Sequence, residues 1–78
     1  MSGAALIDHW LGQLGKAERA ILTTLVEAYP NAMTKELLGV ATDYEPNGGG
    51  FNNALSRLRT LELIEGRGEV KASDDLFD

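Results

Sequence analysis

Apolar residues recur at helical spacing in the first third of the chain. Residues 4–14 and 16–29 each carry apolar side chains three and four positions apart, which places them on one face of a helix. Gly15 is suited to end the first helix, and Pro30 ends the second because proline cannot continue it. The pattern predicts a short leading helix and a longer core helix over 16–29. The expected apolar stripes consist of Leu6, Ile7, Trp10, Leu11, Leu14, Ile21, Leu22, Leu25, Val26 and Tyr29.

A brief link over 31–33, which is compatible with extended backbone, leads to a second pair of helical patterns. Thr34 is a good N-cap and Glu36 lies near the positive end of the helix that follows, so we expect a helix over 35–41. The expected apolar face of this short helix is formed by Leu37, Leu38 and Ala41.

Residues 43–50 are rich in turn formers, and the chain must therefore change direction there. Helical spacing resumes directly after Gly50, so a fourth helix is predicted from that point. Asn53, Ser56 and Thr60 face away from its apolar side. The apolar side is expected to consist of Phe51, Ala54, Leu55, Leu58 and Leu61.

The C-terminal part of the chain has the pattern of a β-hairpin. Residues 63–65 and 69–72 have strand-compatible side chains, and the two glycines in the intervening 66–68 suit a tight turn. The tail over 73–78 is acidic and is expected to fray unless Leu76 and Phe77 dock on the core.

This order of elements resembles winged helix-turn-helix DNA-binding domains. The resemblance rests on residues 51–59, with the sequence FNNALSRLR, and on residues 58–66, with the sequence LRTLELIEG, which look like a recognition helix and its exit into a wing. It covers about residues 16–72 and implies a mainly α fold with a small β-hairpin, in the α+β class. In such a fold a three-helix core carries a short wing, and here a leading helix precedes it. The resemblance also implies a recognition helix in the DNA major groove while the wing contacts the backbone.

Two features depart from the family pattern. The loop between the two helices of the helix-turn-helix is longer and richer in glycine than in many such domains, which leaves their relative angle open. The wing is very short, with only Arg67 at its tip, so deep insertion into the minor groove is not expected.

Composition limits the class of protein. A chain of 78 residues with 44% hydrophobic and 24% charged residues is expected to form one globular domain over 1–78, with a leading helix over 1–15 and a tail over 73–78. The absence of cysteine excludes disulfides and thiolate zinc sites. No apolar run approaches the roughly 18 residues needed to span a bilayer. We therefore expect a soluble, cytoplasmic domain without a membrane partner.

The net charge of −5 argues against nucleic-acid binding, because contacts of Lys and Arg with phosphates usually dominate affinity. The charge is unevenly distributed, however. Residues 47–61 contain Arg57 and Arg59 and no acidic residue, so the only basic stretch is the predicted recognition helix. The local charge therefore permits nucleic-acid binding, which the net charge of the whole chain disfavours.

The predicted DNA-binding residues have side chains that can bind bases or phosphates. Asn52 and Asn53 can each pair with adenine, Ser56 faces the same way, and Arg57 can bind guanine or phosphate. The alternative is an ordinary solvated polar face. Further candidates for contact with the DNA backbone are Arg59, Arg67 and Lys71.

Backbone amides at Gly48, Gly49 and Gly50 could approach a phosphate of the DNA backbone at a helix N-terminus, and a flexible turn that redirects the chain is favoured over nucleotide binding. No Lys-Ser/Thr pair follows, so the run is not a nucleotide-binding P-loop. His9 is the only histidine and lacks companion metal ligands, and Ser56 lacks a base nearby in the sequence. We expect no catalytic site, no metal and no cofactor.

The function expected from these observations is binding of double-stranded DNA, in a regulatory role or as the terminal module of a larger DNA-associated protein. The alternative is a winged helix that binds a protein partner and no nucleic acid. The apolar stripe that includes Leu6, Trp10 and Leu14 packs on helix 16–29 in one interpretation and forms a homodimer seam in the other.

Overall fold

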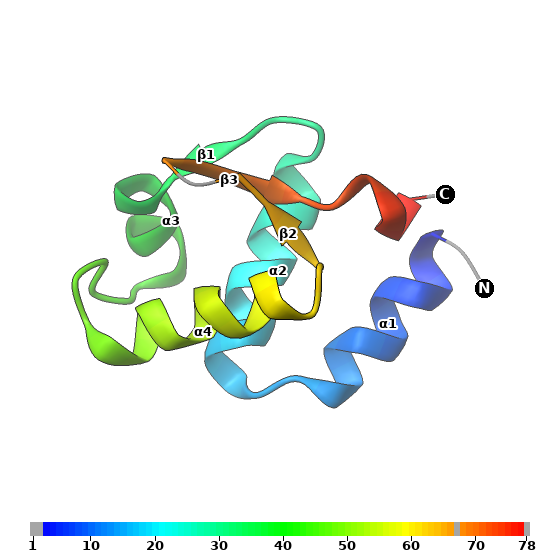
Figure 1. Ribbon diagram of the computed structural model, residues 1–78, viewed down its shortest axis with the longest axis horizontal. Coiled ribbons are helices and arrows are strands. Elements are labelled where there is room, and N and C mark those ends of the chain that lie inside the picture. The colour runs from blue at the N-terminus through cyan, green and yellow to red at the C-terminus, as the bar shows by residue number, and fades with distance from the viewer. Residues whose placement is uncertain (1–2, 67, 78) are drawn as a thin grey trace.

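The computed structural model describes residues 3–66 and 68–77 of the chain. These residues form a mainly helical α+β structure with four α-helices, a three-stranded antiparallel sheet and a C-terminal 3-10 helix (Figure 1). In chain order the elements are α1 (Gly3–Gln13), α2 (Lys16–Ala28), β1 (Met33–Thr34), α3 (Lys35–Thr42), α4 (Gly49–Thr60), β2 (Ile64–Glu65), β3 (Glu69–Ala72) and η1 (Asp74–Phe77).

Helix α2 is the central element, since it contacts α1, α3, α4 and β3. Its predicted apolar stripe is confirmed, because Ile21, Leu22 and Leu25 are each 0% exposed. The helix ends at Ala28, one residue before the predicted end, and Tyr29 is its C-cap before Pro30. Burial of these three large aliphatic side chains makes α2 one of the main hydrophobic contributors to the core.

The two helices that follow pack on α2 through their own apolar faces. Thr34 is the N-cap of α3, and its Oγ1 accepts a hydrogen bond from the amide of Leu37 at 3.2 Å. Helix α4 begins at Gly49 with Gly48 as its N-cap, so it starts two residues earlier than the sequence predicts. Its inner face is as expected: Phe51, Ala54, Leu55 and Leu58 are buried.

The predicted apolar face of α3 is wrong at two of its three positions. Leu38 is fully buried, but Leu37 is 59% exposed and Ala41 also faces solvent. Gly39 lies on the inner side, where a Cβ atom would come within 2.6 Å of Pro46 Cγ. Helix α3 is therefore turned so that Leu38 and Gly39 face the domain, and the loop over 43–48 packs closely against it.

The hairpin is confirmed and gains a third strand. Strand β3 lies between β1 and β2, with Met33 opposite Val70 and Ile64 opposite Ala72. Gly66 in the turn has φ of 99°, and a Cβ atom there would clash with the Glu69 carbonyl oxygen, so glycine is required. The link after α2 thus becomes the edge strand β1.

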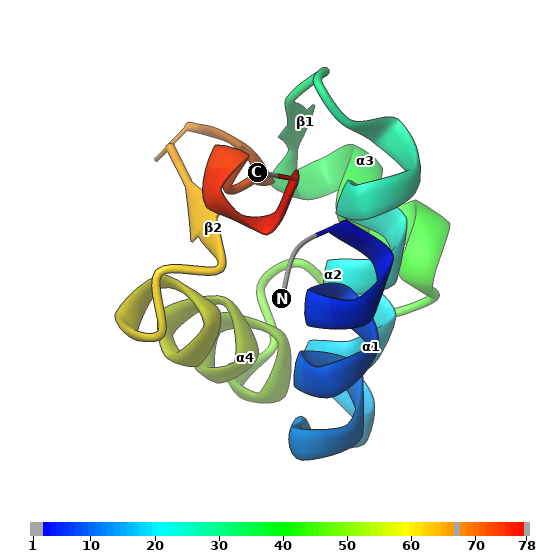
Figure 2. The same ribbon diagram turned by 90° about the vertical axis from the view of Figure 1, so that its right-hand side faces the viewer.

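Both ends of the described chain meet at the same end of the molecule (Figure 2), where α1 contacts η1. Leu14, directly after α1, is 5% exposed and Leu76 of η1 is 2% exposed. The ring of Phe77 stacks on that of Tyr29, with centroids 3.8 Å apart. The acidic tail is therefore docked through Leu76 and Phe77 as far as residue 77.

Candidate nucleic-acid interface

The side of α4 that faces away from α2 is exposed and polar. Asn53, Ser56 and Thr60 recur along it at helical spacing, and Arg57 lies on its flank. No acidic residue occurs in α4. We call these four residues the outer face of α4. The small polar side chains of Asn53, Ser56 and Thr60 leave the helix free to approach another molecule closely.

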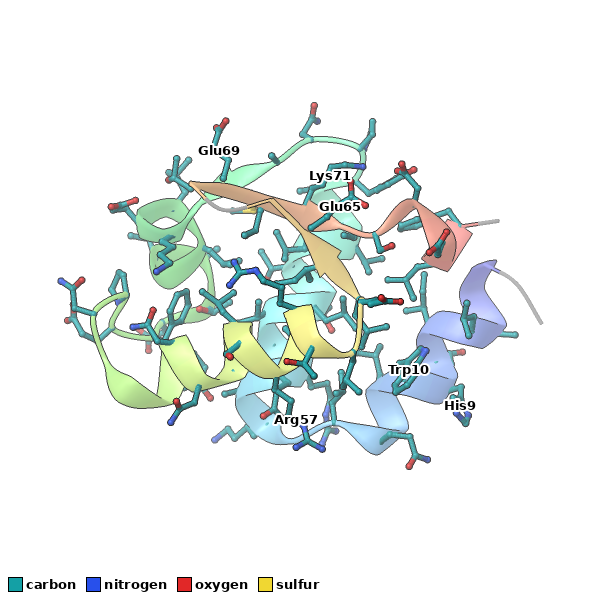
Figure 3. All side chains as sticks on the ribbon, viewed as in Figure 1. His9, Trp10, Arg57, Glu65, Glu69 and Lys71 are labelled. Atoms are coloured by element: carbon teal, nitrogen blue, oxygen red, sulfur yellow. The ribbon has the colours of Figure 1, made fainter. Side chains whose placement is uncertain are left out.

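The two arginines of α4 lie on different sides of this face. Arg57 points away from the sheet, whereas the labelled residues of the hairpin lie on the other side of the helix (Figure 3). Arg59 donates a hydrogen bond from one guanidinium nitrogen to the carbonyl oxygen of Gly66 at 3.2 Å. Arg59 therefore fastens α4 to the hairpin turn, and its remaining N–H groups are the ones available to a phosphate.

The prediction that Asn52 points outward is wrong. Its side chain is half-buried, and its Nδ2 donates to the carbonyl oxygens of Pro46 at 3.1 Å and Gly48 at 2.9 Å. Its Oδ1 accepts a hydrogen bond from Lys35 Nζ at 3.1 Å. Because both ends of the amide are occupied, Asn52 holds the loop before α4 in place, and Asn53 is the asparagine that faces solvent.

Lys71 also differs from the expectation of a free cation on the wing. Its Nζ lies 2.7 Å from Asp74 Oδ1 and 3.7 Å from Glu65 Oε1, and 5.1 Å from the centroid of the Tyr29 ring. The hydrogen bond with Asp74 raises the pKa of Lys71 and lowers the pKa of Asp74, which also accepts a hydrogen bond from Tyr29. The charge of Lys71 is thus offset by two carboxylates.

The glycine run lies at the N-terminus of α4. Gly48 is the N-cap without a side-chain hydrogen bond, and Gly49 and Gly50 form the first turn, with no atom within 4 Å of a Cβ built at either. Amides of this first turn are accessible to an anion, and the predicted contact with phosphate remains a prediction. Arg67 lies outside the described residues.

The leading helix packs on its own domain. Leu14 is in the core, and Leu6 and Trp10 are partly buried against it. Figure 3 shows His9 directed away from the molecule, while its ring lies edge-on to that of Trp10 at 5.8 Å. The homodimer seam through Leu6, Trp10 and Leu14 remains a prediction. Only the exposed parts of these side chains could take part in it.

Two features of α3 were not expected from the sequence. Lys35 bonds Asn52 across the loop, and Leu37 and Val40 are the large hydrophobic side chains that remain exposed among the described residues. Leu37 and Leu38 are adjacent and equally apolar in a helix of eight residues, so the sequence pattern carries no signal for which of them faces inward.

No protein-family model matches this chain, and neither a curated protein nor a solved structure is detectably similar to it. Within residues 3–66 and 68–77, no helix has both the length and the apolar character needed to cross a membrane. In the same part of the chain, no group of three or more His, Asp or Glu side chains is arranged to hold a metal ion. The function has to be inferred from the fold and its surfaces.

Proposed function

We propose that this chain is a winged helix-turn-helix domain that binds double-stranded DNA, with the outer face of α4 in the major groove. In this assignment α2, α3 and α4 form the three-helix core, α4 is the recognition helix, and β2 and β3 form the wing. The order of elements, from α2 through β1, α3 and α4 to the hairpin, supports the proposal.

The observation that carries the proposal is the chemistry of the outer face of α4. It is exposed, contains no carboxylate, and combines small polar side chains with Arg57 in a chain whose net charge is −5. The major groove is about 12 Å wide and admits one helix. Asn53 would pair with adenine, Arg57 with guanine or a phosphate, and the free N–H groups of Arg59 with the DNA backbone.

A fluorescence-anisotropy titration with a labelled random-sequence duplex at low salt tests the proposal. Arg57→Ala should weaken binding several-fold and reduce the salt slope by about one if Arg57 contacts a phosphate. Arg19→Ala on α2 is the matched control, since it removes the same charge from another helix. If the native chain shows no salt-dependent binding, the proposed function is wrong, and if both variants bind equally, the role of Arg57 is wrong.

A protein-binding winged helix without affinity for nucleic acid is the second candidate. The net charge of −5 and the pairing of Lys71 with Glu65 and Asp74 favour it, because few cations remain for the DNA backbone. The same titration separates the two candidates, since only DNA binding requires affinity that falls as salt rises.

A further inference from the structure

Helix α3 presents an apolar surface to solvent. Val40 is 81% exposed and Leu37 is 59% exposed, and Ala41 is exposed beside them. We call these three residues the α3 patch. They lie within one and a half turns on the side of the helix that faces away from the buried Leu38 and Gly39, so they add little to the core of their own domain. In Figure 1, α3 lies at the opposite end of the long axis from α1.

A hollow of about 550 Å³ adjoins the patch. Val40 forms one edge of it, and the loop over 43–46 forms the other wall together with Gly39. Hydrogen bonds hold this loop in place: the amide of Tyr44 donates to the Gly39 carbonyl at 3.0 Å, and Asn52 Nδ2 donates to the Pro46 carbonyl at 3.1 Å. The hollow is therefore preformed, and an apolar side chain could enter it with little rearrangement.

The charged residues that line this hollow, Asp43 and Glu45, are both acidic, whereas Lys16 and Arg19 of α2 line a different hollow together with Ala41 and Thr42. Glu36, Asp43 and Glu45 are exposed, and none of them forms an ion pair among the described residues. The nearby cation Lys35 is turned toward Asn52. A partner that covers the apolar side chains would consequently bring its own charged residues opposite carboxylates.

We propose that the α3 patch and the adjoining hollow bind a basic amphipathic helix of another protein. Such a helix would place apolar residues one turn apart against Leu37 and Val40 and surround them with Lys or Arg opposite Glu36, Asp43 and Glu45. Charge complementarity selects this occupant. In a two-fold dimer through the same patch the carboxylates of both copies would face each other, and DNA would meet them with phosphates. The proposal does not depend on DNA binding.

An NMR titration of the ¹⁵N-labelled chain tests this site with two synthetic amphipathic peptides. Both have the same leucine spacing, but one has lysine and the other glutamate at the polar positions. The lysine peptide should shift amide resonances of residues 36–46, and the glutamate peptide should not. Binding of both peptides alike, or shifts confined to other elements, would overturn the proposal.

Two substitutions of equal charge locate the effect. Val40→Glu should weaken the binding of the lysine peptide by about tenfold or more, as the loss of a central apolar contact typically does. Ser56→Glu adds the same charge on α4 and should leave the affinity unchanged. Both positions are exposed, so the amide spectrum of each variant should remain that of a folded domain. Equal affinity of the Val40→Glu variant and the native chain would overturn the site.

The contribution of charge is measured separately with the triple variant Glu36→Gln, Asp43→Asn, Glu45→Gln. Its affinity for the lysine peptide should be lower than that of the native chain and should change little with salt. Asparagine suits position 43, where φ is 62°. Sedimentation equilibrium of the chain alone tests whether the α3 patch binds a second copy. A dimer that dissociates in the Val40→Glu variant would assign the patch to this contact and overturn the proposal.

Discussion

Helices α3 and α4 both pack one side on α2, yet the sides that they leave to solvent are chemical opposites. The free side of α3 carries Leu37 and Val40 near three carboxylates that form no ion pair among the described residues, whereas the outer face of α4 carries small polar groups and Arg57. Each helix also has a normal apolar inner side. The difference therefore does not arise from folding requirements, which both helices meet in the same way.

The comparison shows why the total charge of this chain is a poor guide to its partners. The net charge of −5 averages a stretch over 49–60 that has no carboxylate with a stretch over 35–46 that has three and a single lysine. Partners respond to local potential within about 10 Å, the screening length at moderate salt. Two surfaces of opposite character suit two different partners, and the following substitutions test each side of the comparison.

The largest expected difference separates two neighbouring leucines of α3. Leu38 is 0% exposed and Leu37 is 59% exposed. Leu38→Ala should lower the free energy of unfolding by about 2–5 kcal/mol, because it leaves a cavity in the core. Leu37→Ala should change it by less than about 0.5 kcal/mol. Urea unfolding followed by circular dichroism measures both, and equal losses would mean that α3 does not turn Leu38 inward and Leu37 outward.

Replacement of a glycine by alanine should change the stability of the fold in opposite directions in α3 and α4. A Cβ at Gly39 would lie 2.6 Å from Pro46 Cγ and 2.9 Å from the Tyr44 carbonyl oxygen, so Gly39→Ala should destabilise the fold by about 1–3 kcal/mol through overpacking. Gly50 has open space around it, and Gly50→Ala should stabilise the fold by up to about 1 kcal/mol. Melting temperatures give the sign of each change. Stabilisation by Gly39→Ala would contradict the close packing of the loop on α3.

The adjacent asparagines of α4 should separate stability from binding. Asn52→Ala removes hydrogen bonds to Pro46, Gly48 and Lys35, which should lower the free energy of unfolding by about 1–2 kcal/mol. Asn53→Ala should leave the stability nearly unchanged, and it should weaken the binding of duplex DNA in the anisotropy titration. If Asn52→Ala instead keeps full stability, its amide does not hold the loop, and the original expectation of an outward Asn52 would return.

Elements with long, regular patterns could be predicted from the sequence. Helix α2 has a stripe of several apolar residues and a terminating Pro30, and the hairpin has glycines in its turn, so local pattern alone determines both. The rotation of α3 could not be predicted in this way. In a helix of eight residues, Leu37 and Leu38 are adjacent, and which one faces inward depends on how Pro46 packs against Gly39.

The candidate site was predictable to a similar degree. That α4 would expose Asn53, Ser56 and Arg57 follows from its period, because Phe51, Ala54, Leu55 and Leu58 must face α2. The roles of Asn52 and Lys71 depend on the paths of the neighbouring segments. Asn52 meets a loop whose path spacing does not specify, and Lys71 meets Asp74 only because η1 docks beside β3.

The smallest expected effect contrasts the paired Lys71 with Arg57, which has no ion pair among the described residues. The hydrogen bond from Lys71, followed by that from Tyr29, lowers the pKa of Asp74 below its ordinary value of 3.8. A lowered carboxyl pKa stabilises the fold above pH 3.8, and this contribution is lost as the pH falls through the lowered value. Because the pair is exposed, the effect should be small.

Asp74→Asn should therefore flatten the acid side of the curve of melting temperature against pH, and Lys71→Met should do so as well. The double variant should lose less than the sum of the two single variants, since both remove the Lys71–Asp74 contact, although Asp74→Asn also changes the hydrogen bond from Tyr29 and Lys71→Met also removes the ion pair with Glu65. The raised pKa of Lys71 adds stability below its ordinary value of 10.5, which is lost as the pH rises through the raised value. An unchanged acid limb in Asp74→Asn would mean that the pair does not form in solution. Lys71 of β3 would then be offset by Glu65 alone, and Lys71→Met should weaken the binding of duplex DNA.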